Sequence, residues 1–200
     1  GSSANLLAVF AAGNPLKKNH LKRGDEVIVP VLCWSTSIWP LVQFGLKPVF
    51  VDIDIHTLNI NISQLEKKIT KKTKAIMLIN VLGISSDLFK IKKIAKRNKL
   101  LIFEDNCESL GTKLKNKYLG TFGDYASFSF YYSHEITSGE GGMSTCNHDK
   151  DYEILRTTYL FNNYGQPQSD FEGLFTATMK DLLNYLGAFK SALTTANDAV

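Results

Sequence analysis

Short apolar segments alternate with helical patterns along most of this 200-residue chain. Ala75–Asn80 (AIMLIN) and Leu100–Asp105 (LLIFED) are almost wholly apolar, which is typical of strands buried on both faces of a sheet. Between them, Leu88–Asn98 has the apolar spacing of a helix. Because strands that alternate with helices indicate βαβ units, the sequence predicts an α/β domain with a mostly parallel sheet sandwiched by helices.

The same alternation defines the remaining elements. Expected strands are Glu26–Pro30, Pro48–Asp52, Ala75–Asn80, Leu100–Asp105, Tyr125–Phe130 and Gly142–Cys146, and expected helices are Ser3–Ala12, Thr36–Phe44, Ile62–Ile69 and Leu88–Asn98. Farther on, Asn162–Gly173 is polar and reads as a loop, and Lys180–Ala196 has helical spacing. Since the chain ends inside this helical pattern, we expect a fragment: residues 1–165 form a large domain, and residues 166–200 form a loop and helix leading toward a further domain.

The composition excludes several classes of protein. With 44% hydrophobic and 21% charged residues, the chain can bury one substantial core. The net charge of +4 is mild and the lysine-rich stretch Lys67–Lys72 reads as a solvated helix face, so we expect no nucleic-acid partner. No run of about 18 apolar residues is present, so no membrane partner is expected either. The widely spaced Cys33, Cys107 and Cys146 favour reduced thiols in the cytoplasm over a zinc or disulfide site.

The start of the chain has the pattern of a phosphate site. Gly1, Ser2 and Ser3 directly precede an apolar-periodic run, as they would at a helix N-terminus with free backbone N–H groups. Such an end binds phosphate through its amides, its dipole and its hydroxyls. Because many ordinary helices open in the same way, this pattern alone leaves a plain helix start as the alternative.

A carboxylate ends one of the most apolar expected strands. Ligands of α/β proteins bind at the carboxyl ends of parallel strands, so Asp105 is expected at a ligand site. A carboxylate there can pair with a pyridinium nitrogen and make the ring of a cofactor an electron sink. An aspartate that merely caps the strand end is the alternative reading.

The segment Ser127–Gly142 (SFSFYYSHEITSGEGG) resembles the cofactor-lysine segment of the DegT/DnrJ/EryC1/StrS sugar aminotransferases, which use pyridoxal phosphate. Those enzymes typically read S-F-x-x-x-K-x-[hydrophobic]-x-x-G-E-G-G there. In this chain His134, five residues after Ser129, stands at the lysine position. An imidazole cannot make the covalent bond by which a lysine amine anchors the cofactor, but it can move a proton near neutral pH.

Further strings extend the resemblance over roughly residues 1–165: GSSANLLA, KRGDEVI, EDNCESLG and GTFGD. They are similar to the lysine-less branch of the family, the nucleotide-sugar 3-dehydratases and 3-dehydrases that use pyridoxamine phosphate. This resemblance implies the large domain of the fold type I pyridoxal-phosphate-dependent transferases, without its C-terminal small domain. The chain departs from the family in one motif. The family has a G-Y-N motif whose asparagine can reach a neighbouring subunit's cofactor, and this motif is absent here, where the corresponding stretch is Leu174-Phe175-Thr176.

The resemblance also implies roles for seven residues. They are Ser2, Ser3 and Ser129 at the cofactor phosphate, Trp34 stacked on the ring, Asp105 at the ring nitrogen, Glu108 near the ring hydroxyl and His134 as the catalytic base. For Trp34 a core position is the alternative, since a tryptophan after a buried strand usually packs inside.

The reaction implied is a C3 dehydration. The amine of pyridoxamine phosphate would condense with the C4 ketone of a nucleotide-linked 4-keto-6-deoxyhexose. His134 would then remove a proton from the C4′ carbon of the cofactor while the C3 hydroxyl leaves. Glutamate would act as amino donor and regenerate the pyridoxamine form. A homodimer in the cytoplasm, serving dideoxysugar and O-antigen lipopolysaccharide biosynthesis, is the corresponding expectation.

Three alternatives remain open at this point. A [2Fe-2S]-dependent CDP-sugar 3-dehydrase would need four cysteines, and in this chain Cys146 alone follows His134. A pyridoxal-phosphate-dependent aminotransferase would need another lysine, and none lies within ten residues of His134. A catalytically inactive family member that serves as a binding subunit would fit the missing G-Y-N motif.

Overall fold

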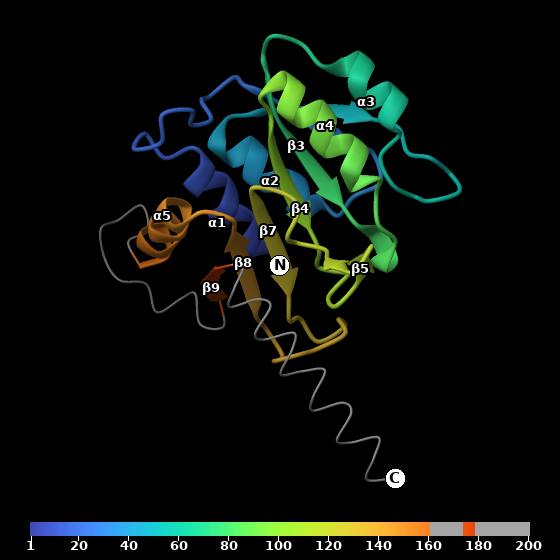
Figure 1. Ribbon diagram of the computed structural model, residues 1–200. Helices are drawn as coiled ribbons and strands as arrows, with labels where there is room; N and C mark the ends of the chain where they lie inside the picture. Colours follow the sequence, from blue (N-terminus) through green and yellow to red (C-terminus); the bar gives the residue numbers. More distant parts are fainter. Residues whose placement is uncertain (161–173, 179–200) are drawn as a thin grey trace.

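The computed structural model describes residues 1–160 and 174–178 of the protein. Within these residues a seven-stranded sheet has the order β2-β1-β3-β4-β7-β8-β9 (Figure 1). Its strands are β1 (Glu26–Pro30), β2 (Lys47–Val51), β3 (Thr73–Ile79), β4 (Leu101–Asp105), β7 (Tyr125–Ser129), β8 (Gly142–Cys146) and β9 (Leu174–Thr178). The first five in the sheet order are mutually parallel, β8 is antiparallel to β7, and β9 is parallel to β8. The predicted mostly parallel α/β sheet is confirmed.

Helices cover both faces of the sheet. They are α1 (Ser2–Ala12), α2 (Ser35–Phe44), α3 (Ile62–Lys68), α4 (Leu88–Asn98), α5 (Asp149–Leu160) and the 3₁₀ turn η1 (Val81–Gly83). One core contains the buried residues of α1, α2 and α5, and a second core contains those of α3 and α4. Figure 1 shows α3 and α4 side by side in the upper part of the molecule. No helix of the described part is long and apolar enough to cross a bilayer.

Residues 75–79 of β3 are apolar without interruption, because both faces of this part of the strand are covered. Met77 packs into the core under α1 and α2, whereas its neighbours Ile76 and Leu78 pack into the core under α3 and α4. Successive side chains of a strand point to opposite faces, so the part of the strand that has helices on both faces is buried at every position.

All of the expected strands and helices within the described residues are present, with ends that differ by at most two positions. The elements that were not predicted are α5, β9, the 3₁₀ turn η1 and the two-stranded hairpin of β5 (Lys113–Leu114) and β6 (Lys117–Tyr118). The turn of the hairpin consists of Lys115 and Asn116, which have positive φ values of 49° and 64°. Because this turn contains no glycine, the sequence does not predict its left-handed conformation. The predicted loop 162–173 and helix 180–196 lie outside the described residues.

The topology places several strand ends at one edge of the sheet. Ile79, near the end of β3, is in register with Asp105 at the end of β4, and Asp105 is in register with Ser127 of β7. Because these strands are parallel, the segments that follow them leave the sheet at the same edge. Helix α1 also contacts this edge, since its Asn5 is hydrogen-bonded to Asp105.

Candidate active site

A cavity of about 600 Å³ lies at the carboxyl ends of the parallel strands. It is lined by six of the seven residues that the sequence singled out: Ser2, Trp34, Asp105, Glu108, Ser129 and His134. The seventh, Ser3, is exposed on α1 and is not among the residues that line the cavity. The fold therefore brings together in one cavity residues that lie far apart in the sequence.

One wall of the cavity is the start of α1. Its N-cap residue Gly1 makes no side-chain cap, so the first backbone amides of the helix have no side-chain acceptor. A Cβ atom on Gly1 would lie 2.6 Å from Cys107 Sγ and 3.0 Å from Ser129 Cβ, so the absence of a side chain lets the chain pass close to both residues. Free amides, a helix dipole and the hydroxyls of Ser2 and Ser129 form a combination that suits an anionic group such as phosphate.

The Asp105 carboxylate is fixed by three donors. Its Oδ2 atom accepts hydrogen bonds from Asn5 Nδ2 and from Ser37 Oγ, each at 2.7 Å. Its Oδ1 atom accepts a longer bond of 3.2 Å from the Cys107 backbone N–H. The residue is 5% exposed and lines the cavity, so its remaining acceptor capacity on Oδ1 is available to a cationic ring nitrogen.

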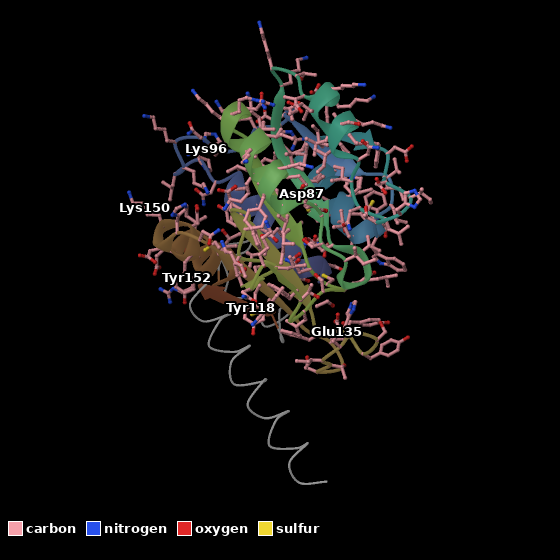
Figure 2. The ribbon with its side chains drawn as sticks, turned by 45° about the vertical axis from the view of Figure 1, so that its right-hand side comes forward. Asp87, Lys96, Tyr118, Glu135, Lys150 and Tyr152 are labelled. Carbon is pink, nitrogen blue, oxygen red and sulfur yellow. The ribbon has the colours of Figure 1, made fainter. Side chains whose placement is uncertain are left out.

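His134 lies in the turn that follows β7. Its backbone N–H donates to the Tyr131 carbonyl oxygen at 3.0 Å, and the two rings meet edge-on with centroids 6.3 Å apart. Both residues line the cavity, as do Ser133 and Glu140 from the same segment. Figure 2 shows the adjacent Glu135 on this loop at the edge of the protein, and Glu135 is exposed and outside the cavity lining.

Trp34 and Glu108 lie at the cavity in different ways. Trp34 is the N-cap residue of α2 and is 72% exposed, so the alternative of a core tryptophan is wrong. An exposed indole on a cavity wall is available to stack on a planar ligand. Glu108 accepts a hydrogen bond from the Leu82 backbone N–H at 2.9 Å and so supports the η1 turn, in which Leu82 has a φ of 51°.

Two thiols that the sequence did not mark as functional also line the cavity. Burial raises the pKa of Cys107 well above its usual range, and the negative charge of Asp105 raises it further. Burial and the same charge raise the pKa of Cys33. Both thiols therefore stay protonated near neutral pH and offer no strong nucleophile.

Asn5 and Ser37 are the partners of Asp105 that sequence reasoning missed. Asn5 is 3% exposed within an otherwise apolar helix, and Ser37 is fully buried in the first turn of α2. A buried amide in an apolar helix needs a hydrogen-bond partner, so the position of Asn5 in the pattern was the available signal. The pattern does not tell which residue the partner is.

Comparison with known proteins gives a consistent result. The model of the DegT/DnrJ/EryC1/StrS aminotransferase family matches residues 1–195. The chain is 48% identical over 155 residues to a GDP-4-keto-6-deoxy-D-mannose 3-dehydratase of Escherichia coli O55:H7, an alignment that covers 78% of this chain and 40% of that protein. It is 48% identical over 167 residues to the lipopolysaccharide biosynthesis protein RfbH of Salmonella typhimurium, which covers 83% of this chain and 38% of the relative.

A solved structure is similar as well. The crystal structure of a GDP-4-keto-6-deoxymannose-3-dehydratase with a trapped PLP-glutamate geminal diamine matches with a TM-score of 0.75 and 43% identity. That match covers 80% of this chain and 41% of the other. The chain thus spans about two fifths of the length of the curated relatives that it matches.

Proposed function

The chain belongs to the DegT/DnrJ/EryC1/StrS aminotransferase family and has its pyridoxal-phosphate-dependent fold, and from this premise we propose that the protein dehydrates a sugar instead of aminating it. The substrate would be a nucleotide-linked 4-keto-6-deoxyhexose, which loses its C3 hydroxyl. Pyridoxamine phosphate, in exchange with pyridoxal phosphate, would be the cofactor.

One observation carries this proposal. The cavity contains the imidazole of His134 and, among the described residues, no lysine side chain. A cofactor in it would therefore be bound without a covalent link to a lysine of this part of the chain. An imidazole can accept and return a proton near neutral pH, which is what removal of a hydroxyl next to a carbonyl carbon requires of the protein.

The chemistry of the cavity residues suits the phosphate and the ring of the cofactor. The uncapped start of α1, with Ser2 and Ser129, would bind the phosphate. Asp105 would bind the ring nitrogen through the carboxylate that Asn5 and Ser37 hold in place. When bound, the cofactor supplies a conjugated ring that accepts electrons from the reacting sugar.

The remaining residues would shape the cavity around the ring. Trp34 offers an apolar surface for stacking, and Glu108 supports the turn at Leu82 on the cavity edge. The neutral thiols of Cys33 and Cys107 add no competing charge beside Asp105. We propose that Ser3 binds the phosphate through its backbone N–H, because its side chain is not in the cavity lining.

Relatives suggest the finer identity of the reactants. The curated relative from Escherichia coli is named for a GDP-linked sugar, so we propose GDP as the nucleotide. The solved relative contains a PLP-glutamate adduct, which supports glutamate as the amino donor. The relative from Salmonella is named for lipopolysaccharide biosynthesis, and we propose that pathway class for this protein.

We also propose that the protein is a cytoplasmic homodimer. Trp39 and Val42 are exposed apolar side chains three residues apart on α2, and they support an interface beside the cavity, since exposed apolar surface marks contact sites. The free thiols of the three cysteines are consistent with a reducing compartment.

The test is a product analysis. The protein is incubated with pyridoxamine phosphate, glutamate and GDP-4-keto-6-deoxymannose, and the sugar is analysed by mass spectrometry and NMR. Loss of the C3 hydroxyl supports the dehydratase. Formation of an amino sugar supports the aminotransferase, activity only with a reductase and a CDP-sugar supports the [2Fe-2S] type, and binding without turnover supports an inactive subunit.

A further inference from the structure

We propose that Asn5 is a positioning residue: it sets which oxygen of the Asp105 carboxylate meets the cofactor and fixes that carboxylate relative to the phosphate end of the cavity. This inference rests on the proposed function, which places the ring nitrogen of the cofactor at Asp105. It assigns a role to a side chain that lies behind the residues proposed to contact the cofactor.

The observation is a chain of buried hydrogen bonds that connects four elements. Ser127 Oγ of β7 donates to Asn5 Oδ1 at 2.6 Å, and Asn5 Nδ2 of α1 donates to Asp105 Oδ2 at 2.7 Å. Ser37 Oγ of α2 donates to the same Oδ2 atom at 2.7 Å. None of the four side chains is more than 5% exposed, so water does not compete for these bonds.

The directions of these bonds select one oxygen for the ligand. An ionised carboxylate can only accept, so Asn5 must present its NH₂ group to Asp105 and its carbonyl oxygen to Ser127. With two short hydrogen bonds on Oδ2, the acceptor capacity left for a ligand lies on Oδ1, which accepts a longer hydrogen bond of 3.2 Å from the Cys107 backbone N–H. Without Asn5 the carboxylate would lose a short bond that holds this orientation.

The place of Asn5 in the helix gives the network a second consequence. Asn5 is one turn from Ser2, and its own backbone N–H donates to the Gly1 carbonyl oxygen at 2.9 Å. One rigid helical turn therefore joins the proposed phosphate site to the carboxylate. Both ends of a bound cofactor would be positioned by the same element.

The experiment compares two ligands: pyridoxamine phosphate, and an analogue with carbon in place of its ring nitrogen. Dissociation constants for both are measured by fluorescence titration on wild type, Asn5→Leu, Ser127→Ala and Ser144→Ala. Ser144→Ala is the matched control, because buried Ser144 donates to the Ala4 carbonyl oxygen of the same helix at 2.9 Å without contacting Asp105.

We expect wild type and Ser144→Ala to prefer the natural cofactor by the same factor. Asn5→Leu should reduce this preference by roughly tenfold, as the loss of one charge-assisted bond would, with little change for the analogue. Ser127→Ala keeps the Asn5 amide but removes the donor to its Oδ1 atom, so a smaller reduction is expected. This variant tests the inference if Asn5→Leu does not fold.

An unchanged preference in both variants, or an equal loss of affinity for the two ligands, would overturn the inference. Equal binding of the two ligands by wild type would instead overturn the Asp105 contact of the proposed function, and the positioning role with it.

Discussion

Glu104 and Asp105 are neighbours on β4, and their buried carboxylates are bound on opposite faces of the sheet. Asp105 is bonded to Asn5 and Ser37 on the face of α1 and α2. Glu104 accepts the backbone N–H groups of Gly120 and Phe122 at 2.9 and 2.8 Å, together with that of Gly123. One carboxylate therefore serves the cavity, and the other fixes the loop before β7.

The first prediction concerns the structural carboxylate. Glu104→Gln replaces one acceptor oxygen with an NH₂ group that faces the Gly120 N–H, so a buried donor loses its partner. We expect the free energy of unfolding to fall by about 1–3 kcal/mol. Urea denaturation at neutral pH measures this, with Glu66→Gln as the control, since that change removes only an exposed ion pair between Glu66 of α3 and Arg97 of α4. A change no larger than that of the control would contradict the structural role of Glu104.

The pH dependence of that stability follows from the same residue. Burial raises the pKa of Glu104 above its value in the unfolded chain. The folded state therefore retains this proton to higher pH, and the associated stability is present below the ordinary glutamate pKa and lost as pH rises through the raised one. The urea midpoint of wild type should fall as pH rises through this range, and that of Glu104→Gln should not. The same pH dependence of the midpoint in both proteins would contradict the prediction.

Asp105→Asn tests the carboxylate of the cavity. We expect affinity for pyridoxamine phosphate to fall roughly tenfold or more, because a neutral amide replaces the charge opposite the ring nitrogen. Stability should fall by only about 1–2 kcal/mol, since the new amide oxygen can still accept from Ser37. Fluorescence titration and urea denaturation give the two values. Asp149→Asn, in the exposed first turn of α5, should leave the affinity unchanged, and unaltered affinity in Asp105→Asn would remove the ring-nitrogen contact.

The thiols report the charge of Asp105 independently of any cofactor. Burial first, and then Asp105, raise the pKa of Cys107, so this thiol should react slowly with iodoacetamide at pH 8. Asp105→Asn should increase the rate of Cys107 alkylation several-fold. The rate should stay below that of a solvent-exposed thiol, because Cys107 remains buried. Cys146 is the internal control: burial, with Asp151 as a further cause, raises its pKa to about 11, and Asp105 is not among the causes. Equal acceleration at both cysteines, measured by peptide mass spectrometry, would indicate a loosened fold instead.

The strands and the cavity could be predicted because local pattern determines them. A strand buried on both faces is mostly apolar, and a polar residue at its carboxyl end, such as Asp105, lies at the edge where the other parallel strands end. The partners of Asp105 could not be predicted, since Asn5 is 100 residues away in the chain and Ser37 is 68 away. Helix α5 was missed because most of its residues are polar, although Asp149 and Asp151 in its first turn are a usual signal of a helix start. The role of each cavity residue toward the cofactor stays a prediction.

The central claim is that the cofactor is bound beside His134 without a covalent link. The most direct measurement is the intact mass of the protein after incubation with pyridoxal phosphate, reduction with borohydride and removal of free cofactor. We predict that wild type keeps its original mass, and that His134→Lys gains one cofactor at residue 134 while losing dehydration. A wild-type protein that gains one cofactor on a single lysine, or a His134→Lys variant that keeps full dehydratase activity, would contradict the claim.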